Sequence, residues 1–180
     1  MSKENEAKEN GYIHVYTGNG KGKTTAAIGL AVRATGAGKK VYFGQFMKEG
    51  DYSEIKILKE RFPDIDLFQY GSDGFVLGRN PTENELSQGE NGFKHAYDAL
   101  MSENYDVVIL DEINVALFIN LISLCDVKKL IENKPNHTEL ILTGRYANDE
   151  IIEMADLVSE IKEVKHYFQK GVSARKGIEM

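Results

Sequence analysis

The stretch TGNGKGKTT, which begins at Thr17, constrains the fold of this 180-residue chain more than any other feature. It follows the apolar run Tyr12–Tyr16 and precedes an alanine-rich helical pattern, so it connects a predicted strand to a predicted helix. Glycines let backbone N–H groups turn toward an anion without Cβ clashes, and the N-terminus of the helix adds a partial positive charge. The stretch therefore predicts a phosphate-binding loop, with a tight turn that binds nothing as the alternative.

The loop departs from the usual spacing G-x-x-x-x-G-K-[ST] at one position, because Thr17 stands where the first glycine belongs. In the usual arrangement the lysine reaches a terminal phosphate and the next hydroxyl is a Mg²⁺ ligand. We expect Lys23 and Thr24 to take these two roles, in a loop whose geometry Thr17 changes. The predicted nucleotide-binding residues of the loop are Gly18, Asn19, Gly20, Lys21, Gly22, Lys23, Thr24 and Thr25.

Apolar runs and helical patterns alternate along the rest of the chain, as in a parallel sheet with helical crossovers. The predicted strands are Tyr12–Tyr16, Lys40–Phe46, Asp66–Tyr70, Val107–Leu110, Glu139–Leu142 and Leu157–Ile161. The predicted helices are Lys23–Thr35, Ser53–Arg61, Glu83–Glu103, Ser123–Asn133 and Asn148–Ala155. These elements indicate one α/β domain of the P-loop NTPase-like type at residues 11–180, with a mostly parallel six-stranded sheet and helices on both faces. The polar residues 1–10 indicate a mobile arm.

Two acidic residues, Asp111 and Glu112, follow the uniformly apolar run VVIL. Such a run is typical of a strand covered on both faces, and ligands of parallel sheets bind beyond the carboxyl ends of the strands. Paired acids there suit a Mg²⁺ site, either as direct ligands or through water. The alternative is a helix N-cap followed by a first-turn acid.

The net charge of −6 argues against a broad nucleic-acid-binding surface, although it permits a local basic site. No apolar run reaches the ~20 residues that span a bilayer, and the polar N-terminus does not resemble a secretory signal. We therefore predict a cytoplasmic protein that binds neither nucleic acid nor membrane. The single cysteine, Cys125, excludes an internal disulfide and is expected to be a small core residue.

Several segments together resemble the ATP:cob(I)alamin adenosyltransferases of the corrinoid-biosynthesis type, also called cob(I)yrinic acid a,c-diamide adenosyltransferases. The segments are TGNGKGKTTAAIGLAVRATGAGKKV, Gln45-Phe46, LDEIN, TGR, ADLVSEI, KH and KGVSARKGIE, which run in the family's order from Tyr12 to Glu179.

The resemblance implies a RecA-like homodimer whose substrates are ATP, bound with Mg²⁺, and a reduced corrinoid. Co(I) would attack the 5′ carbon of ATP and release triphosphate, with ATP held in the reverse sense to that of ordinary phosphate-loop enzymes. Lys23, Thr24 and Glu112 would carry the chemistry. Thr24, Glu112 and Asp111 would hold the metal, with Glu112 as the direct ligand. Arg145 in TGR would bind ATP, and a surface arginine at the entry to a helix is the competing interpretation. An electron-donating flavoprotein reductase is a possible partner.

The corrinoid side of the resemblance falls in YGSDGFVLGRN, where the family has Gly-Phe-Thr-Trp. Phe75 would pack under the corrin ring, and Leu77 stands at the tryptophan position, which supplies bulk without an aromatic face. A packed core pair is the competing interpretation of both residues. The competing function for the whole chain is a P-loop NTPase or small-molecule kinase that cleaves a phosphoanhydride bond.

Overall fold

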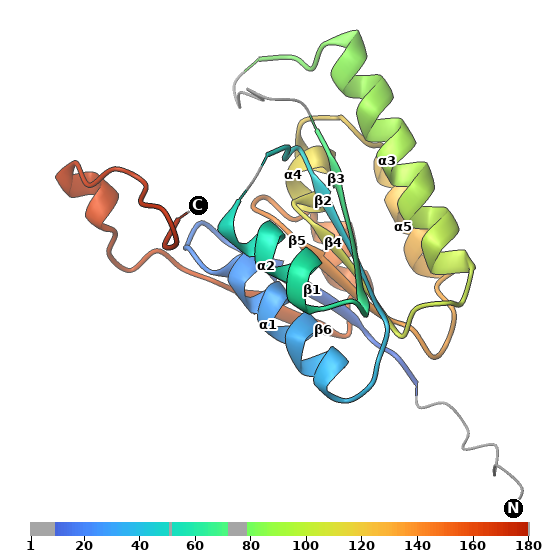
Figure 1. Ribbon diagram of the computed structural model, residues 1–180. Coiled ribbons are helices and arrows are strands. Elements are labelled where there is room, and N and C mark those ends of the chain that lie inside the picture. Colours follow the sequence, from blue (N-terminus) through green and yellow to red (C-terminus); the bar gives the residue numbers. More distant parts are fainter. Residues whose placement is uncertain (1–9, 51, 72–78, 180) are drawn as a thin grey trace, which may run out of the picture.

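A six-stranded, all-parallel sheet forms the centre of the computed structural model, which describes residues 10–50, 52–71 and 79–179 (Figure 1). The strands lie in the order β3-β2-β4-β5-β1-β6, and each pairing between neighbours is parallel. Their bounds are β1 Ile13–Thr17, β2 Val41–Phe46, β3 Ile65–Tyr70, β4 Val107–Asp111, β5 Glu139–Thr143 and β6 Leu157–Glu160.

Helices cover both faces of the sheet (Figure 1). Residues of α1 and α2 pack into one apolar cluster, and residues of α3, α4, α5 and α6 pack into the other. The bounds are α1 Lys23–Gly36, α2 Ser53–Arg61, α3 Glu83–Met101, α4 Ile113–Phe118, α5 Leu124–Glu132 and α6 Asp149–Met154, with a 3₁₀ turn at Tyr167–Lys170.

Strand β4 shows why the core has two halves. Its side chains alternate, so that Val107 and Ile109 join the cluster under α1 and α2, while Val108 and Leu110 join the other cluster. Both sets are at most 3% exposed. A strand covered on both faces has a continuous apolar sequence. The residues that follow its carboxyl end lie at the edge of the sheet.

The predicted fold class is confirmed, and the structure is consistent with a P-loop NTPase-like fold. All six strands and all five helices predicted from the sequence are present to within two residues at each end. Helix α4 was missed because five of its six residues are buried, so the segment has no polar face and no amphipathic pattern. The predicted arm lies outside the described residues except for Asn10.

The prediction for Cys125 is wrong, because its side chain is exposed. Helix α5 turns Val127, Leu130 and Ile131 toward the core, which places Cys125 on the outer side of its first turn. In the described part of the chain, no helix combines the length and apolarity needed to cross a membrane.

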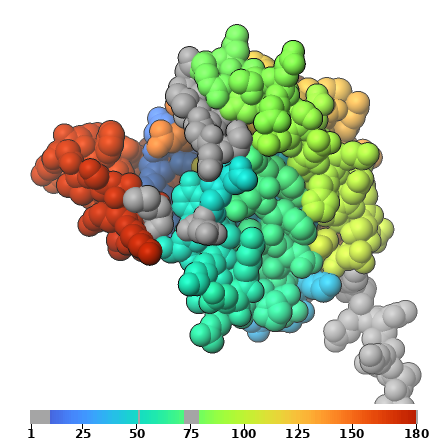
Figure 2. All heavy atoms as spheres, turned by 45° about the horizontal axis from the view of Figure 1, so that its top comes forward, coloured from blue at the N-terminus to red at the C-terminus, as the bar shows by residue number. Residues whose placement is uncertain are grey.

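The chain after β6 leaves the body and forms a projecting segment whose end turns back toward the loop after β1 (Figure 1). We call residues 162–179 the C-terminal segment. In the space-filling view this segment is a separate projection, and atoms from the N-terminal part of the chain lie in the recess between it and the body (Figure 2).

Candidate active site

A cavity of about 660 Å³ opens at the carboxyl edge of the sheet. Its wall is built by the loop after β1, the segments that follow β2, β4 and β5, the start of α2, and the C-terminal segment. The lining residues are Asn19, Gly20, Lys21, Gly22, Lys23, Thr24, Thr25, Ile28, Lys48, Tyr52, Ser53, Glu54, Glu112, Arg145, His166, Gly177, Ile178 and Glu179. All predicted loop residues except Gly18 therefore face one cavity, as does Arg145.

The three glycines of the loop are required for different reasons. Gly18 has φ +95°, and a Cβ there would lie 2.4 Å from the Ile161 carbonyl oxygen. A Cβ on Gly20 would lie 2.8 Å from the same oxygen, which accepts the Gly20 N–H at 2.7 Å. Gly22 has open space around it but adopts φ +126°, a conformation that favours glycine. The loop is thus pressed against the chain that leaves β6.

Replacing Gly20 with alanine should destabilise the protein by about 1–3 kcal/mol, because the added methyl group collides with backbone atoms. Gly29 provides the matched control, since it is an exposed residue within α1 where an added methyl group would meet nothing within 4 Å. Gly29→Ala should stabilise by about 0.5–1 kcal/mol. Denaturant unfolding of both variants measures the difference, and equal stabilities would contradict the close packing of the loop.

Thr17 is the last residue of β1 and not part of the turn. It pairs with Glu160 of β6, its carbonyl oxygen accepts the Ile161 N–H at 2.8 Å, and its side chain accepts the Ala147 N–H at 3.4 Å. The position where the usual motif has its first glycine is therefore an extended residue here, and the turn begins at Gly18.

Lys23 is buried, with 6% of its surface exposed. Its ammonium group donates to the carbonyl oxygens of Gly18 and Gly20, each at 2.8 Å. These two acceptors fold the side chain back along the loop and explain its burial. Burial lowers the pKa of Lys23, and the Glu112 carboxylate partly offsets that effect.

Asp111 is fully buried behind the cavity wall and accepts hydrogen bonds from four side chains. Thr143 donates to Oδ1 at 2.7 Å and Thr24 donates to the same oxygen at 2.9 Å. Gln45 and Lys48 donate to Oδ2 at 3.1 Å and 2.9 Å. The carboxylate thus connects the loop after β1 to the ends of β2, β4 and β5, so the four segments are held in register at this edge.

Glu112 is the residue that the structure turns toward the cavity. It adopts φ +62° at the N-cap position of α4, and its own N–H donates to Thr143 Oγ1 at 3.1 Å. Its side chain makes no capping hydrogen bond, which argues against the N-cap interpretation. Burial and the neighbouring Asp111 raise its pKa, and the Lys48, Lys23 and Arg145 cations act in the opposite direction.

The side-chain oxygens at this edge are of the kind that bind Mg²⁺. Thr24 and Glu112 present a hydroxyl and a carboxylate to the cavity, with the Asp111 carboxylate directly behind Thr24. Among the described residues, no three His, Cys, Asp or Glu side chains gather into a metal-binding group. A cation here would take few protein ligands and several oxygens from phosphates or water, which is the pattern that Mg²⁺ prefers.

Lys48 is a cavity residue that we did not predict from the sequence. It follows β2 and places its ammonium group 2.9 Å from Asp111 Oδ2 and 3.3 Å from Thr24 Oγ1. Burial by itself would lower its pKa, but the carboxylates of Asp111 and Glu112 outweigh that effect and raise the pKa. Its position just after a strand was the signal that could have identified it.

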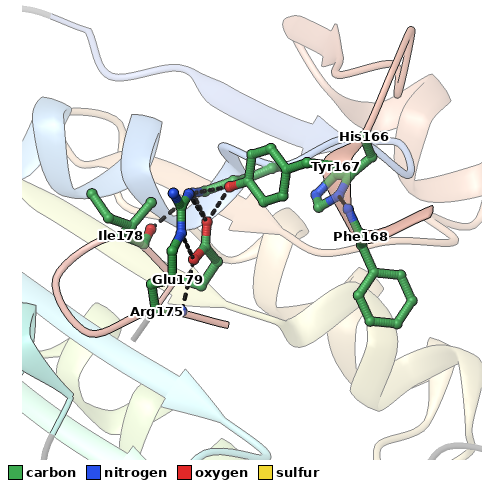
Figure 3. A network of polar contacts seen from close by, with 7 residues as sticks. His166, Tyr167, Phe168, Arg175, Ile178 and Glu179 are labelled. Carbon is green, nitrogen blue, oxygen red and sulfur yellow. Dashed lines mark hydrogen bonds and ion pairs between the residues drawn. The ribbon is translucent and has the colours of Figure 1, made fainter. Parts of the chain in front are cut away.

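The C-terminal segment forms the outer wall of the cavity, and its end is held by Lys21 of the loop after β1. Lys21 Nζ donates to the Ile178 carbonyl oxygen at 2.8 Å and to Glu179 Oε1 at 2.9 Å. The Glu179 carboxylate also accepts from Tyr167 and Arg175 (Figure 3). The Arg175 guanidinium lies 4.9 Å from the centre of the Tyr167 ring, while the Phe168 ring points away from this cluster (Figure 3). Hydrogen bonds from Arg175 and Tyr167 lower the pKa of Glu179, which keeps it ionised.

Two predicted site residues cannot be placed. Phe75 and Leu77 lie outside the described residues, which end at Gly71 and resume at Arg79. Apart from Gly18, which packs against Ile161, the other predicted residues line the cavity or, in the case of Asp111, lie directly behind it.

A family model and several similar proteins identify one family. A family model described as ATP:corrinoid adenosyltransferase BtuR/CobO/CobP matches residues 9–180. The chain is 39% identical over 171 residues to a corrinoid adenosyltransferase of Escherichia coli (strain K12), covering 95% of this chain and 86% of that protein. It is 37% identical over 172 residues to corrinoid adenosyltransferase CobA of Salmonella typhimurium, covering 96% and 87%. A corrinoid adenosyltransferase of Sinorhizobium sp. is 35% identical over 173 residues, covering 95% and 81%.

Proposed function

The chain belongs to the ATP:corrinoid adenosyltransferase family, and from this premise we propose how its cavity carries out the reaction. The protein is an enzyme that transfers the 5′-deoxyadenosyl group of ATP to the reduced cobalt of a corrinoid. The observation that best supports the proposal is the convergence of Lys21, Lys23, Lys48 and Arg145 on one cavity beside a glycine loop, in a chain of net charge −6. These cations suit a polyphosphate, and the same wall also carries the carboxylates of Glu54, Glu112 and Glu179.

The reaction places simple demands on the protein. Reduced cobalt supplies the electron pair, a cobalt–carbon bond forms at C5′, and the bond from C5′ to the triphosphate oxygen breaks. The electron pair of the broken bond leaves with the triphosphate, so negative charge develops there. The protein must align C5′ with the cobalt and stabilise that charge, and neither task needs a general base.

We assign the triphosphate to the loop residues from Gly18 to Thr25. Backbone N–H groups at the start of α1 and the ammonium group of Lys23 would face the phosphates. Lys23 would turn from the carbonyl oxygens of Gly18 and Gly20 toward the anion, which restores its lost hydrogen bonds. Arg145 would add a second cation from the end of β5. The alternative of phosphoanhydride cleavage is not favoured by the comparisons.

We further propose that Mg²⁺ accompanies ATP and is held by Thr24 and Glu112, with Asp111 acting through Thr24. The ion would neutralise charge on the departing triphosphate. The support is the donor set that faces the cavity and the hydrogen bond from Thr24 to Asp111 at 2.9 Å.

Glu112→Gln should raise the Mg²⁺ concentration that gives half of the maximal rate by about tenfold or more. The reason is that the side chain keeps its size but loses its charge. Corrinoid affinity should change much less. A Mg²⁺ titration of the initial rate at saturating ATP measures the effect, with Glu54→Gln as a control in the part of the cavity wall that α2 supplies. An unchanged titration for Glu112→Gln would assign the metal to other ligands.

On the corrinoid side we propose that Phe75 packs under the corrin ring and displaces the lower cobalt ligand, which makes the cobalt easier to reduce. Leu77 would add bulk beside it. Phe75→Ala should then slow the reaction that starts from Co(II) more than the reaction that starts from chemically reduced Co(I). Equal slowing of both reactions would contradict this role.

We also propose that the enzyme is a cytoplasmic homodimer and that a flavoprotein reductase delivers the electron. Exposed apolar side chains on the edge strand and the C-terminal segment support an interface, and they include Leu157 (42% exposed), Val158 (41%) and Phe168 (72%). Light scattering during size-exclusion chromatography tests the dimer, and a monomer at micromolar concentration would contradict it.

The activity itself is tested by an anaerobic assay with ATP, Mg²⁺ and chemically reduced cobalamin, followed by the visible spectrum. We expect the Co(I) spectrum to convert to that of the alkylated cobalt only when ATP is present. Persistence of the Co(I) spectrum with a folded protein would contradict the proposed function.

A further inference from the structure

We propose that Lys48 is a triphosphate-binding residue whose ammonium group exchanges between Asp111 and the substrate. The inference rests on the proposed function, because it names a further ligand for the leaving group of that reaction. It starts from the contact between Lys48 Nζ and Asp111 Oδ2, at 2.9 Å, on the wall of the cavity.

The backbone beneath Lys48 is firmly held, so only its side chain needs to move. Met47, the preceding residue, adopts φ +58°, and its N–H donates to the Tyr70 carbonyl oxygen at 2.6 Å. A Cβ on Gly71 would lie 2.6 Å from the Lys48 nitrogen, so the chain after β3 packs directly against this point. The root of the side chain is therefore fixed at the mouth of the site, as a ligand-binding residue requires.

Asp111 can release Lys48 without being left unpaired. Thr24, Gln45 and Thr143 donate to its two oxygens at distances of 2.7 to 3.1 Å. These three side chains come from three other segments and would stay in place when the ammonium group turns away. A buried carboxylate that keeps three donors avoids most of the penalty of an unpaired charge.

Lys48 is also the better exposed partner of this ion pair. Its side chain is 22% exposed, whereas that of Asp111 is 0% exposed. A lysine carries its charge on a flexible four-carbon stem, so the ammonium group can sweep several ångströms while the backbone stays still. The free side of the group faces the same cavity as Lys23, Thr24 and Arg145.

A triphosphate has several negative charges, and in the described part of the chain the cavity wall offers it the cationic side chains of Lys21, Lys23, Lys48 and Arg145. Lys21 is tied to Glu179 and Ile178 of the C-terminal segment. Thr24 Oγ1 lies 3.3 Å from Lys48 Nζ, so a divalent cation that binds Thr24 would repel the ammonium group. Binding of Mg²⁺ and triphosphate would thus move the ammonium group of Lys48 from Asp111 to a phosphate oxygen.

Calorimetric titration with inorganic triphosphate, with and without Mg²⁺, tests this role without any adenosyl transfer. Lys48→Gln removes the charge, and Asp111 keeps the hydrogen bonds from Thr24, Gln45 and Thr143. We expect the dissociation constant of this variant for triphosphate to rise about tenfold or more, the effect of one charge-assisted hydrogen bond. Lys48→Arg should recover most of the affinity, and Lys39→Gln, at an exposed lysine after α1, should bind as the unmodified protein does.

Thermal unfolding without ligand separates this role from a purely structural one. If Lys48→Gln unfolds at a lower temperature but binds triphosphate with unchanged affinity, Lys48 serves only to neutralise Asp111 and the proposal is wrong. Failure of the unmodified protein to bind triphosphate at all would reject it too. If triphosphate binding depends on Lys48 while the adenosylation assay fails, the proposal survives and the proposed function does not.

Discussion

Lys23→Ala should lower kcat by a factor of about 10²–10³, which is the usual effect of removing one group that stabilises charge developing in a transition state. The charge here develops on the triphosphate as its bond to C5′ breaks. Lys23 comes from the loop that opens α1, and its ammonium group lies in the cavity wall. The protein should remain folded, although the loop loses the hydrogen bonds from Lys23 to Gly18 and Gly20.

Single-turnover rates at saturating ATP, Mg²⁺ and pre-reduced corrinoid measure this loss directly. Lys39→Ala is the matched control, because it removes an exposed lysine beyond the far end of α1. Circular dichroism confirms that both variants are folded. A rate for Lys23→Ala within a factor of two or three of the unmodified enzyme would exclude Lys23 from the chemistry.

Asp111→Asn should have the largest effect on stability, a loss of about 2–4 kcal/mol in the free energy of unfolding. In asparagine an NH₂ group replaces one carboxylate oxygen, and this group donates hydrogen bonds. It would face the Gln45 amide and the Lys48 ammonium group, which both donate to Asp111. Breaking a buried charged pair usually costs about 3–5 kcal/mol, and the partial exposure of Lys48 reduces that value.

Urea unfolding of Asp111→Asn, followed by fluorescence and circular dichroism, gives the free energy. Asp98→Asn is a suitable control, since Asp98 is exposed on α3. A second variant, Asp111→Asn combined with Lys48→Gln, should show coupling between the two sites, because the ammonium group that the first change strands is also removed. Additive losses would mean that the ion pair contributes little.

The sheet could be predicted because local patterns and the fold agree. The run from Val107 to Leu110 is apolar throughout since both faces of β4 are covered, and the residues after it reach the ligand-binding edge. The same rule placed Asp111, Glu112 and Arg145 at that edge. It did not separate Asp111, which is buried and bonded to four side chains, from Glu112, which faces the cavity, because a φ of +62° at Glu112 decides the direction.

Other parts of the site depend on contacts that no local pattern contains. Lys48 meets Asp111 only after β2 and β4 pair, and Lys21 meets Glu179 across 158 residues of chain. The burial of Lys23 depends on the way the loop folds against Ile161. The same packing explains why Gly18 and Gly20 cannot carry a Cβ. Long-range packing of this kind fixes the geometry of the loop, while the sequence motif identifies only its ligand class.

The identity of the bond that breaks in ATP tests the central claim most directly. The products of a reaction with ATP, Mg²⁺ and a Co(I) corrinoid can be quantified by ³¹P NMR alongside the adenosylated corrinoid. We expect inorganic triphosphate in an amount equal to the adenosylated corrinoid, with no ADP above the background of a reaction without protein. Formation of ADP and orthophosphate in step with turnover would show cleavage at phosphorus and would contradict adenosyl transfer by this site.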